Sequence, residues 1–288
     1  MNELTYKIGD HIVQLSIPTT FHLENYEPFR QEHCDTTPLF HMVVSEALTE
    51  KEISLIGKFD DDVASITVFY IGDGGYRFHI APPRGAECAI MDINASFNHA
   101  TAVLKGGTLS KEYGLNNCLM ILYALSSALN NTILVHASVV SYHERAFLFL
   151  GKSGTGKSTH SRLWLDHIEG SKLLNDDNPA IRLFPNGKVI VYGTPWSGKT
   201  ACYINKQFPA GAIVRLRQAP ANKITNNGNA QAFASLLSSC STLSWDKKIH
   251  GAICDTIASV VEKTNCYTLD CLPDKAAANL CMQTIYAV

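Results

Sequence analysis

The segment Gly151–Ser158 constrains the fold of this chain more than any other feature. Its sequence, GKSGTGKS, matches the phosphate-loop pattern GxxxxGK[ST] at every fixed position. The apolar stretch Ala146–Leu150 precedes it, and a helix is expected from about Lys157 to His167. Because a phosphate loop joins a buried strand to a helix, this segment predicts an α/β fold.

The loop residues also predict a site for phosphate groups. Glycines let successive backbone N–H groups point at an anion, and the helix N-terminus adds partial positive charge. Lys157 is expected to reach the β- and γ-phosphates, and the Ser158 hydroxyl to ligate Mg²⁺. A glycine-rich turn that matches by chance is the alternative. The predicted phosphate-binding residues are Gly151, Ser153, Gly154, Thr155, Gly156, Lys157, Ser158 and Thr159.

A pair of carboxylates follows at a telling distance. Asp176 and Asp177 stand 19 and 20 residues after Lys157, which leaves room for one helix and a returning strand. We therefore expect the pair beside the loop, within reach of Mg²⁺ and the γ-phosphate. Adjacent strand residues point opposite ways, so one carboxylate can hold metal while the other faces an acceptor hydroxyl. A plain Asx turn before Pro179 is the alternative.

Three further residues are candidates for the same site. His136 is expected at the end of a short strand, 15 residues before Gly151, where its ring could lie over the phosphates. A purely structural histidine is the alternative. Arg215 and Arg217 share one face of the expected strand IVRLRQ. One of them could stabilise the transferring charge, or both could be solvated.

The rest of the chain divides by pattern. Residues 1 to 105 predict a β-rich region, in which Ser65–Ile71 and Tyr76–Ile80 flank a glycine-rich hairpin turn. Residues 106 to 288 alternate helices and strands. Leucines at three- and four-residue spacing predict a helix over Leu115–Leu129. Further on, an Asn-Gly pair between two apolar runs predicts a hairpin at about residues 180–192.

Composition excludes several classes of protein. Hydrophobic residues make up 46% of the 288 and charged residues 17%, so the chain can bury a core. Lys and Arg total 24 against 26 Asp and Glu, so neither nucleic acid nor a membrane surface is an expected partner. The nine cysteines form no CxxC pair and are expected to be reduced thiols. Without a secretory or membrane-spanning pattern, the expected location is cytoplasmic.

His136, the loop GKSGTGKS and Asp176-Asp177, in this order and spacing, resemble the HPr kinase/phosphorylase family. They are also similar to the phosphoenolpyruvate carboxykinases, whose loop is likewise followed by an Asp-Asp pair. The match covers about residues 130 to 192, and residues 1 to 105 do not match. The resemblance implies a P-loop domain of this type with a mixed sheet over residues 106–288, preceded by the β-rich region.

The resemblance also implies roles for these residues. Mg²⁺ would be held by Ser158 and one aspartate, and the other aspartate would take the proton from an acceptor serine. We assign the base to Asp176 and the metal to Asp177, with the opposite order left open. His136 and Lys157 complete the predicted catalytic set.

One departure from the family affects the substrate. The family's later Pro-Gly-Arg-Asn run is missing, and Gly193–Thr200 stands in its place. This loop is similar to those of HPr-kinase-like proteins that include kinases of small ribosomal peptides. Lys199 could contact a phosphate or an acidic acceptor, and Trp196 could stack on a base or a peptide side chain. A tight hairpin corner is the alternative.

These observations predict an ATP- and Mg²⁺-dependent kinase acting on a hydroxyl, expected to be serine, of a peptide or small protein. A small-molecule kinase of the same fold is one alternative. A nucleotide-binding sensor or scaffold without turnover is the other. A homo-oligomer is compatible with the sequence but not required by it.

Overall fold

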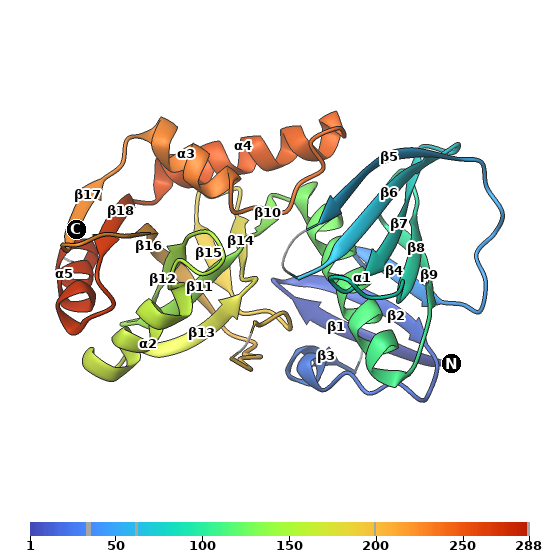
Figure 1. The fold of residues 1–288 in the computed structure, drawn as a ribbon, viewed down its shortest axis with the longest axis horizontal. Helices are drawn as coiled ribbons and strands as arrows, with labels where there is room; N and C mark the ends of the chain where they lie inside the picture. Colours follow the sequence, from blue (N-terminus) through green and yellow to red (C-terminus); the bar gives the residue numbers. More distant parts are fainter. Residues whose placement is uncertain (33–35, 61–62, 199, 287–288) are drawn as a thin grey trace. The chain divides into compact units, whose positions relative to one another are not determined.

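The computed structural model describes residues 1–32, 36–60, 63–198 and 200–286. The chain forms two compact units, Met1–Ser127 and Ala128–Val288. The division falls after residue 127 and not after residue 105, because a long helix belongs with the strands that precede it (Figure 1).

The first unit is built on a nine-stranded mixed sheet, in the order β3-β1-β2-β4-β9-β8-β7-β6-β5. The pairs β2–β4 and β4–β9 are parallel and the others antiparallel, and the predicted hairpin β6–β7 is confirmed. Its elements are β1 (Asn2–Ile8), β2 (His11–Ile17), the 3-10 helix η1 (Glu24–Phe29), β3 (Arg30–Gln31), β4 (Phe40–Val44), β5 (Ile53–Asp60), β6 (Ser65–Ile71), β7 (Gly75–Ala81), β8 (Ala89–Ile93), β9 (His99–Leu104) and helix α1 (Thr108–Ala128).

Helix α1 is tied to this sheet along its length. The Tyr123 hydroxyl donates to the carbonyl of Ile8, 3.1 Å away. A Cβ atom on Gly114 would lie 2.8 Å from the carbonyl oxygen of Cys88, so only glycine allows the helix this close to the chain before β8. The helix begins at Thr108, seven residues before the predicted start. The prediction missed these residues because most of them are exposed or half-buried and they lack the apolar spacing.

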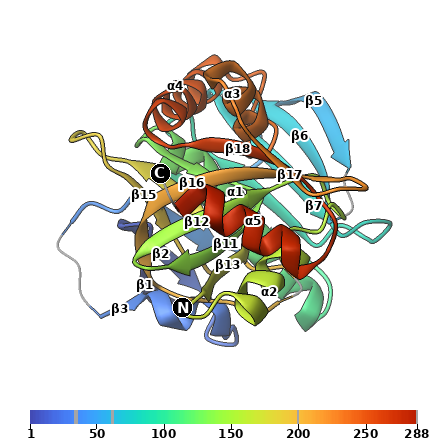
Figure 2. The same cartoon turned by 90° about the vertical axis from the view of Figure 1, so that its left-hand side faces the viewer.

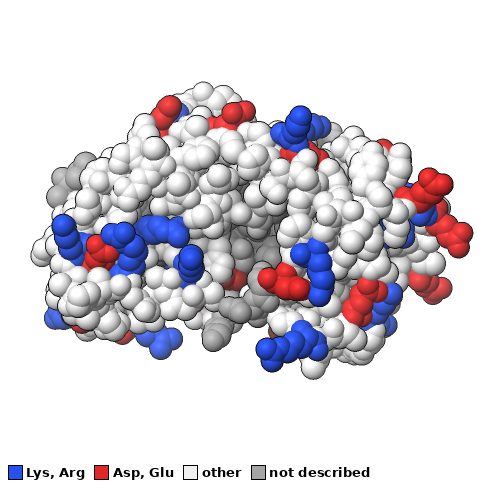
Figure 3. Space-filling model, turned by 45° about the horizontal axis from the view of Figure 1, so that its top comes forward, with Lys and Arg blue, Asp and Glu red and all other residues white. Residues whose placement is uncertain are grey.

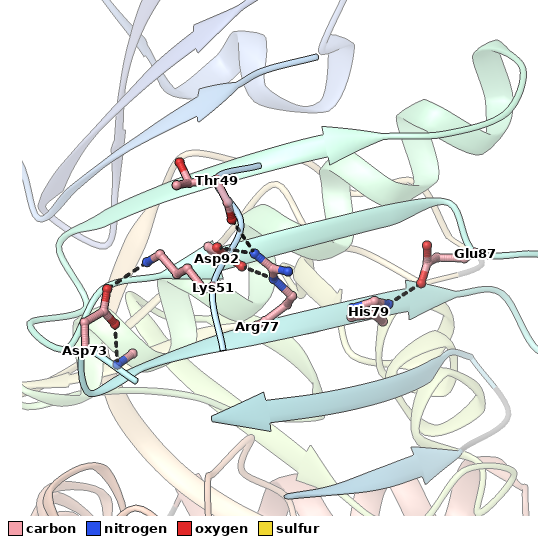
Figure 4. A network of polar contacts seen from close by, with 8 residues as sticks. Thr49, Lys51, Asp73, Arg77, His79, Glu87 and Asp92 are labelled. Carbon is pink, nitrogen blue, oxygen red and sulfur yellow. Dashed lines mark hydrogen bonds and ion pairs between the residues drawn. The ribbon is translucent and has the colours of Figure 1, made fainter. Parts of the chain in front are cut away.

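Ion pairs join neighbouring strands on one face of the first unit (Figure 4). Arg77 of β7 makes two hydrogen bonds to Asp92 of β8, at 2.6 and 2.8 Å. Lys51 lies 2.7 Å from Asp73 in the turn of the β6–β7 hairpin. The nearly buried Arg77–Asp92 pair has the planar two-bond geometry that makes such pairs strong.

The second unit carries a mixed sheet in the order β10-β14-β15-β16-β12-β11-β13, and β18 pairs with β16 and β17. The predicted mixed α/β fold is confirmed here. The elements are β10 (Thr132–Leu134), β11 (Ala137–Tyr142), β12 (Arg145–Leu150), α2 (Lys157–His167), β13 (Lys172–Asp177), β14 (Ala180–Leu183), β15 (Val189–Tyr192), β16 (Gln207–Gln218), β17 (Lys223–Asn226), α3 (Asn229–Leu237), α4 (Lys247–Lys263), β18 (Cys266–Cys271) and α5 (Lys275–Tyr286).

Helices α2 and α5 lie side by side and cover one face of this sheet (Figure 2). Trp164 of α2 is fully buried, with its ring 5.4 Å from Phe147 and 5.6 Å from Phe149 of β12. Strand β12 is buried from Ala146 to Leu150, as its continuous apolar character predicts. This contact fixes the helix that follows the glycine-rich loop against the strand that precedes it.

Strand β11 was not predicted from the sequence, yet it lies between β12 and β13. It reaches β12 through a tight turn in which His143 and Glu144 have positive φ angles of 44° and 56°. Such turns usually carry Asn or Gly, and because neither residue occurs at this turn, the sequence does not indicate the hairpin. The second predicted hairpin, β14–β15, is confirmed, and its Gly187 has the expected positive φ of 80°.

The surface agrees with the balanced composition. Charged side chains of both signs are scattered over the face in Figure 3, between large uncharged areas. Among the described residues, no helix is long and apolar enough to cross a membrane. Eight of the nine cysteines fall in the described part of the chain and are free thiols.

Trp164 gives a test of this core. We expect Trp164→Ala to lower the free energy of unfolding by about 3–5 kcal/mol, because it leaves a large cavity under α2. Leu165→Ala, on the exposed side of the same helix, is the control and should cost less than about 1 kcal/mol. Urea unfolding measures both, and equal losses would contradict the packing described.

Candidate active site

The register of the central strands brings the predicted site residues together. Ala137 of β11 pairs with Leu150 at the end of β12 and, on its other side, with Asp177 at the end of β13. Neighbouring strands are about 4.8 Å apart, so Leu150 and Asp177 lie about 10 Å apart across one strand. The glycine-rich loop therefore begins at the same sheet edge as the two aspartates, as predicted.

The loop has the backbone that an anion site requires. Gly154 and Gly156 have positive φ angles of 76° and 104°, a region that favours glycine. Helix α2 starts at Lys157, directly after Gly156, so its first N–H groups open toward the loop. Ser158 and Thr159, in the first turn, are exposed.

Lys157 is held inside this loop. Its ammonium donates to the carbonyl of Gly151 at 3.1 Å, and only 9% of the residue is exposed. Burial lowers the pKa of Lys157, and the negative charges of Asp177 and Asp176 raise it part of the way back. The charges of both aspartates therefore act on Lys157.

The two aspartates differ in their surroundings. Asp176 is 6% exposed, and its Oδ1 atom has no hydrogen-bond partner among the described residues. Asp177 is about one-third exposed. Burial raises the pKa of Asp177, while His136 and Lys157 lower it part of the way. A buried carboxylate oxygen without a partner is costly, and a bound ligand would relieve the cost.

These donors fit Mg²⁺. The cation prefers oxygen ligands, and Ser158, Asp176 and Asp177 offer only oxygens. Among the described residues no group of three His, Cys, Asp or Glu side chains is arranged to hold a metal. A magnesium ion here would therefore take further ligands from phosphate oxygens and water.

His136 lies at the site but not in a strand as predicted. It falls between β10 and β11, and its backbone N–H donates to the carbonyl of Ser239. Its Nε2 atom is 3.6 Å from Oδ1 of Asp177. A protonated His136 would therefore stabilise the ionised form of Asp177.

Asn175 is a residue of the site that the sequence did not single out. It is fully buried, and its amide donates to the hydroxyl of Thr194 and the carbonyl of Trp196, both at 3.2 Å. Its side-chain oxygen accepts from the N–H of Asp177 at 3.0 Å. One side chain thus joins the aspartate pair to the following loop. The signal available in the sequence was an Asn directly before the Asp-Asp pair.

The loop that begins at Gly193 therefore lies against the aspartates. The N–H of Gly198 donates to the carbonyl of Asp176 at 3.0 Å. The backbones of Ser197 and Asp177 form an isolated antiparallel β-bridge. Trp196 is 3% exposed, so it is not available to stack on a base or a peptide, and that expectation was wrong. The proposed role of Lys199 concerns a residue outside the described ranges.

Arg215 and Arg217 form hydrogen bonds with different partners. Arg215 pairs with Leu150 across β16 and β12, and its guanidinium donates to the carbonyl of Ser235 at 3.1 Å. Its charge contributes to lowering the pKa of Lys157. Arg217 makes two hydrogen bonds to Asp270, at 2.7 and 3.0 Å. Arg215 is thus the arginine at the edge of the site, and Arg217 serves in an ion pair.

Comparisons with known proteins add little. No family model matches the chain, and no curated protein matches it. Among solved structures, the Hpr(Ser) kinase/phosphatase from Coxiella burnetii is similar at 12% sequence identity and a TM-score of 0.33. That match covers 54% of this chain and 88% of the other. A similarity this low does not bear on function, so function is inferred from the residues of the site.

Asn175 can be tested directly. We expect Asn175→Ala to lower the free energy of unfolding by about 1–3 kcal/mol, because buried partners in two segments lose their hydrogen bonds. Asn178→Ala removes a single bond to Asp177 from a less buried position and should cost less. Denaturant unfolding compares them, and an equal or smaller loss for Asn175→Ala would refute the link.

His160 in α2 predicts a pH dependence. Burial lowers its pKa from 6.5 to about 4, and its Nε2 accepts from the Trp164 indole at 3.3 Å. The unfolded chain therefore binds the extra proton first, so stability falls as pH drops from 6.5 toward 4. His160→Gln keeps an acceptor but cannot titrate, and it should remove up to about 3 kcal/mol of that fall.

Unfolding free energies at several pH values measure the effect. A parallel pH dependence in the parent protein and His160→Gln would show that other groups cause the fall.

Proposed function

We propose that the unit Ala128–Val288 binds a nucleoside triphosphate with Mg²⁺. It then transfers the γ-phosphate to a hydroxyl, that of serine, in a peptide or small protein. The observation that carries the proposal is the pair Asp176-Asp177 at the sheet edge where the GKSGTGKS loop begins, with one buried carboxylate oxygen that has no hydrogen-bond partner among the described residues. A loop that only bound phosphate would need no such pair.

The chain's own residues account for binding and orientation. The N–H groups of the loop and the start of α2 receive the phosphate oxygens, and Lys157 neutralises charge on the β- and γ-phosphates. A protonated His136 favours the ionised form of Asp177 through their 3.6 Å contact. Arg215, at the edge of β16, adds positive potential to the same side of the sheet.

The transfer step is a displacement at phosphorus. Asp176 accepts the proton of the acceptor hydroxyl, whose oxygen then bonds to the γ-phosphorus. The bond from that phosphorus to the bridging oxygen breaks, and the nucleoside diphosphate leaves with the electron pair. Held by Ser158 and Asp177, Mg²⁺ would supply charge neutralisation of the phosphate oxygens. The opposite assignment of the two aspartates is the alternative.

Two substitutions separate binding from transfer. We expect Lys157→Ala to weaken ATP binding about 10- to 100-fold, because a charge-assisted contact to phosphate is lost. We expect Asp176→Asn to bind ATP nearly as the parent does but to lose about 100-fold or more in transfer rate. Calorimetry with ATP and Mg²⁺ measures binding, and γ-labelled ATP with cell lysate measures transfer.

Lys172→Ala, an exposed position at the start of β13, is the control and should change neither property. Label in a polypeptide that depends on Asp176 supports the proposal. Label only in a metabolite would indicate a small-molecule kinase, and binding without any label would indicate a sensor. Weakened Mg²⁺ binding in Asp176→Asn but not in Asp177→Asn would assign the metal to Asp176 and the base to Asp177.

A further inference from the structure

A hollow of about 420 Å³ opens beside the glycine-rich loop. Gly154, Thr155 and Gly156 form one wall, α2 forms another, and the ends of β16 and β18 form the rest. In the strand order, β16 and β18 lie on one side of β12, and β11 and β13 with the aspartates lie on the other. The hollow is therefore continuous with the loop and lies across it from Asp176 and Asp177.

We propose that this hollow binds the base and ribose of the nucleotide, and that it does so with little selection among bases. The inference rests on the proposed function, because it takes the loop to hold the triphosphate. It assigns the orientation of the nucleotide, with the γ-phosphate toward β13 and the base toward β18.

The chemistry of the walls fits a planar, weakly polar group. Most of the lining side chains are apolar, and the set includes no Asp, Glu, Lys or Arg among the described residues. Leu272 and Pro273 are exposed there, so apolar surface is presented to solvent at the rim. The volume falls in the ordinary range for small-molecule sites, about 300–1,000 Å³. Covering such surface with a base removes apolar area from water. The apolar lining consists of Leu163, Leu216, Ala219, Cys271, Leu272 and Pro273.

The wall after β18 is fixed before any ligand binds. The side-chain oxygen of Asn222 accepts from the N–H of Leu272 at 2.7 Å, and its amide donates to Asp274 at 3.0 Å. Asp274 in turn accepts from the N–H of Ala277 in the first turn of α5. The N–H of Ala219 donates to the carbonyl of Cys271 at 3.2 Å, so both walls of the hollow are joined. A preformed wall binds without a further ordering cost.

Two of the four polar side chains that line the hollow, Gln218 and His160, already make hydrogen bonds within the protein, which favours weak selection. Reading one base against another needs free donors and acceptors placed at its edge. The amide nitrogen of Gln218 already donates toward the carbonyls of Gly154 and Thr155, at 3.3 and 3.5 Å. His160 is 3% exposed, and its Nε2 atom accepts from Trp164. ATP and GTP should therefore bind with affinities within about tenfold of each other.

Binding of ATP and of inorganic triphosphate, each with Mg²⁺, tests the proposal by calorimetry. The parent should bind ATP at least about tenfold more tightly than triphosphate, because only ATP fills the hollow. Ala219→Phe places a ring in the hollow and should weaken ATP binding about tenfold or more while leaving triphosphate binding unchanged. Ala221→Phe, two residues on at an exposed position, is the matched control and should change neither.

Cys271 provides a second measurement that needs no substitution. Its half-buried thiol lines the hollow, whereas the half-buried Cys254 of α4 does not. Alkylation of Cys271 by a maleimide, followed by peptide mass spectrometry, should slow with ATP and not with triphosphate. The rate at Cys254 should stay constant, which makes it the internal reference if Ala219→Phe does not fold.

The outcomes distinguish the two proposals. Triphosphate binding with no gain from the base, or ATP without effect on Cys271, overturns the base site and leaves the phosphate site standing. Equal weakening of ATP and triphosphate by Ala219→Phe also overturns it. A preference for one purine nucleotide well beyond tenfold overturns the claim of weak selection. Binding of neither ligand to the parent removes the proposed function and this inference with it.

Discussion

The site depends on the register of one strand that the sequence does not reveal. Strand β11 is paired on both sides, and its first residue, Ala137, aligns the end of β12 with the end of β13. A bulge between Val139 and Val140 shifts the pairing with β13 by one residue. Because side chains alternate along a strand, that shift decides which face Asp176 and Asp177 present. The loop and the aspartates meet because this irregularity is built into β13.

The fold tolerates buried charge at this place because charges of opposite sign lie near one another. Lys157 alone in such a position would be strongly disfavoured in its charged form, and so would each aspartate. Together they offset one another in part, and the pKa of Lys157 and that of Asp177 stay shifted in opposite directions by burial. Within the described part of the chain, Oδ1 of Asp176 has no hydrogen-bond partner, so the compensation there is incomplete. A site arranged in this way favours a ligand that brings both negative phosphate oxygens and a cation.

The sequence predicts the local parts of this unit well and their assembly less well. The buried strand β12, the start of α2 at Lys157 and the second hairpin follow from apolar runs, a motif and an Asn-Gly turn. Each of these signals is contained within a few neighbouring residues. The turn at His143 and Glu144 carries no such signal, because the tertiary pairing of β11 holds two ordinary residues at positive φ. Pairing between strands is non-local, so no local pattern in a single sequence predicts it.

The same division applies to individual site residues. Glycines, Lys157 and the aspartate pair form a motif whose spacing has physical meaning, and the structure brings them to one edge. Trp196 looked available for stacking because a loop residue is expected to be exposed, yet the loop folds back onto the site and buries it. The sequence does not single out Asn175, because its role depends on contacts with another segment. An amide buried in a strand becomes informative only when its partners, two segments away in the chain, are known.

The order of the strands also gives the site a direction. Along one sheet edge run Asp177, Ala137, Leu150, Arg215 and Thr268, on β13, β11, β12, β16 and β18 in turn. Carboxylates stand at one end, the phosphate-binding backbone in the middle, and apolar walls at the other end. A nucleoside triphosphate has the same polarity, with charge at one end and a flat, weakly polar base at the other. Under the proposed function, with the base on the β18 side, the γ-phosphate and the acceptor hydroxyl would lie toward β13. The backbone of the loop after Gly193 is bonded to the aspartates on that side, so under the proposed function this loop would lie beside the acceptor.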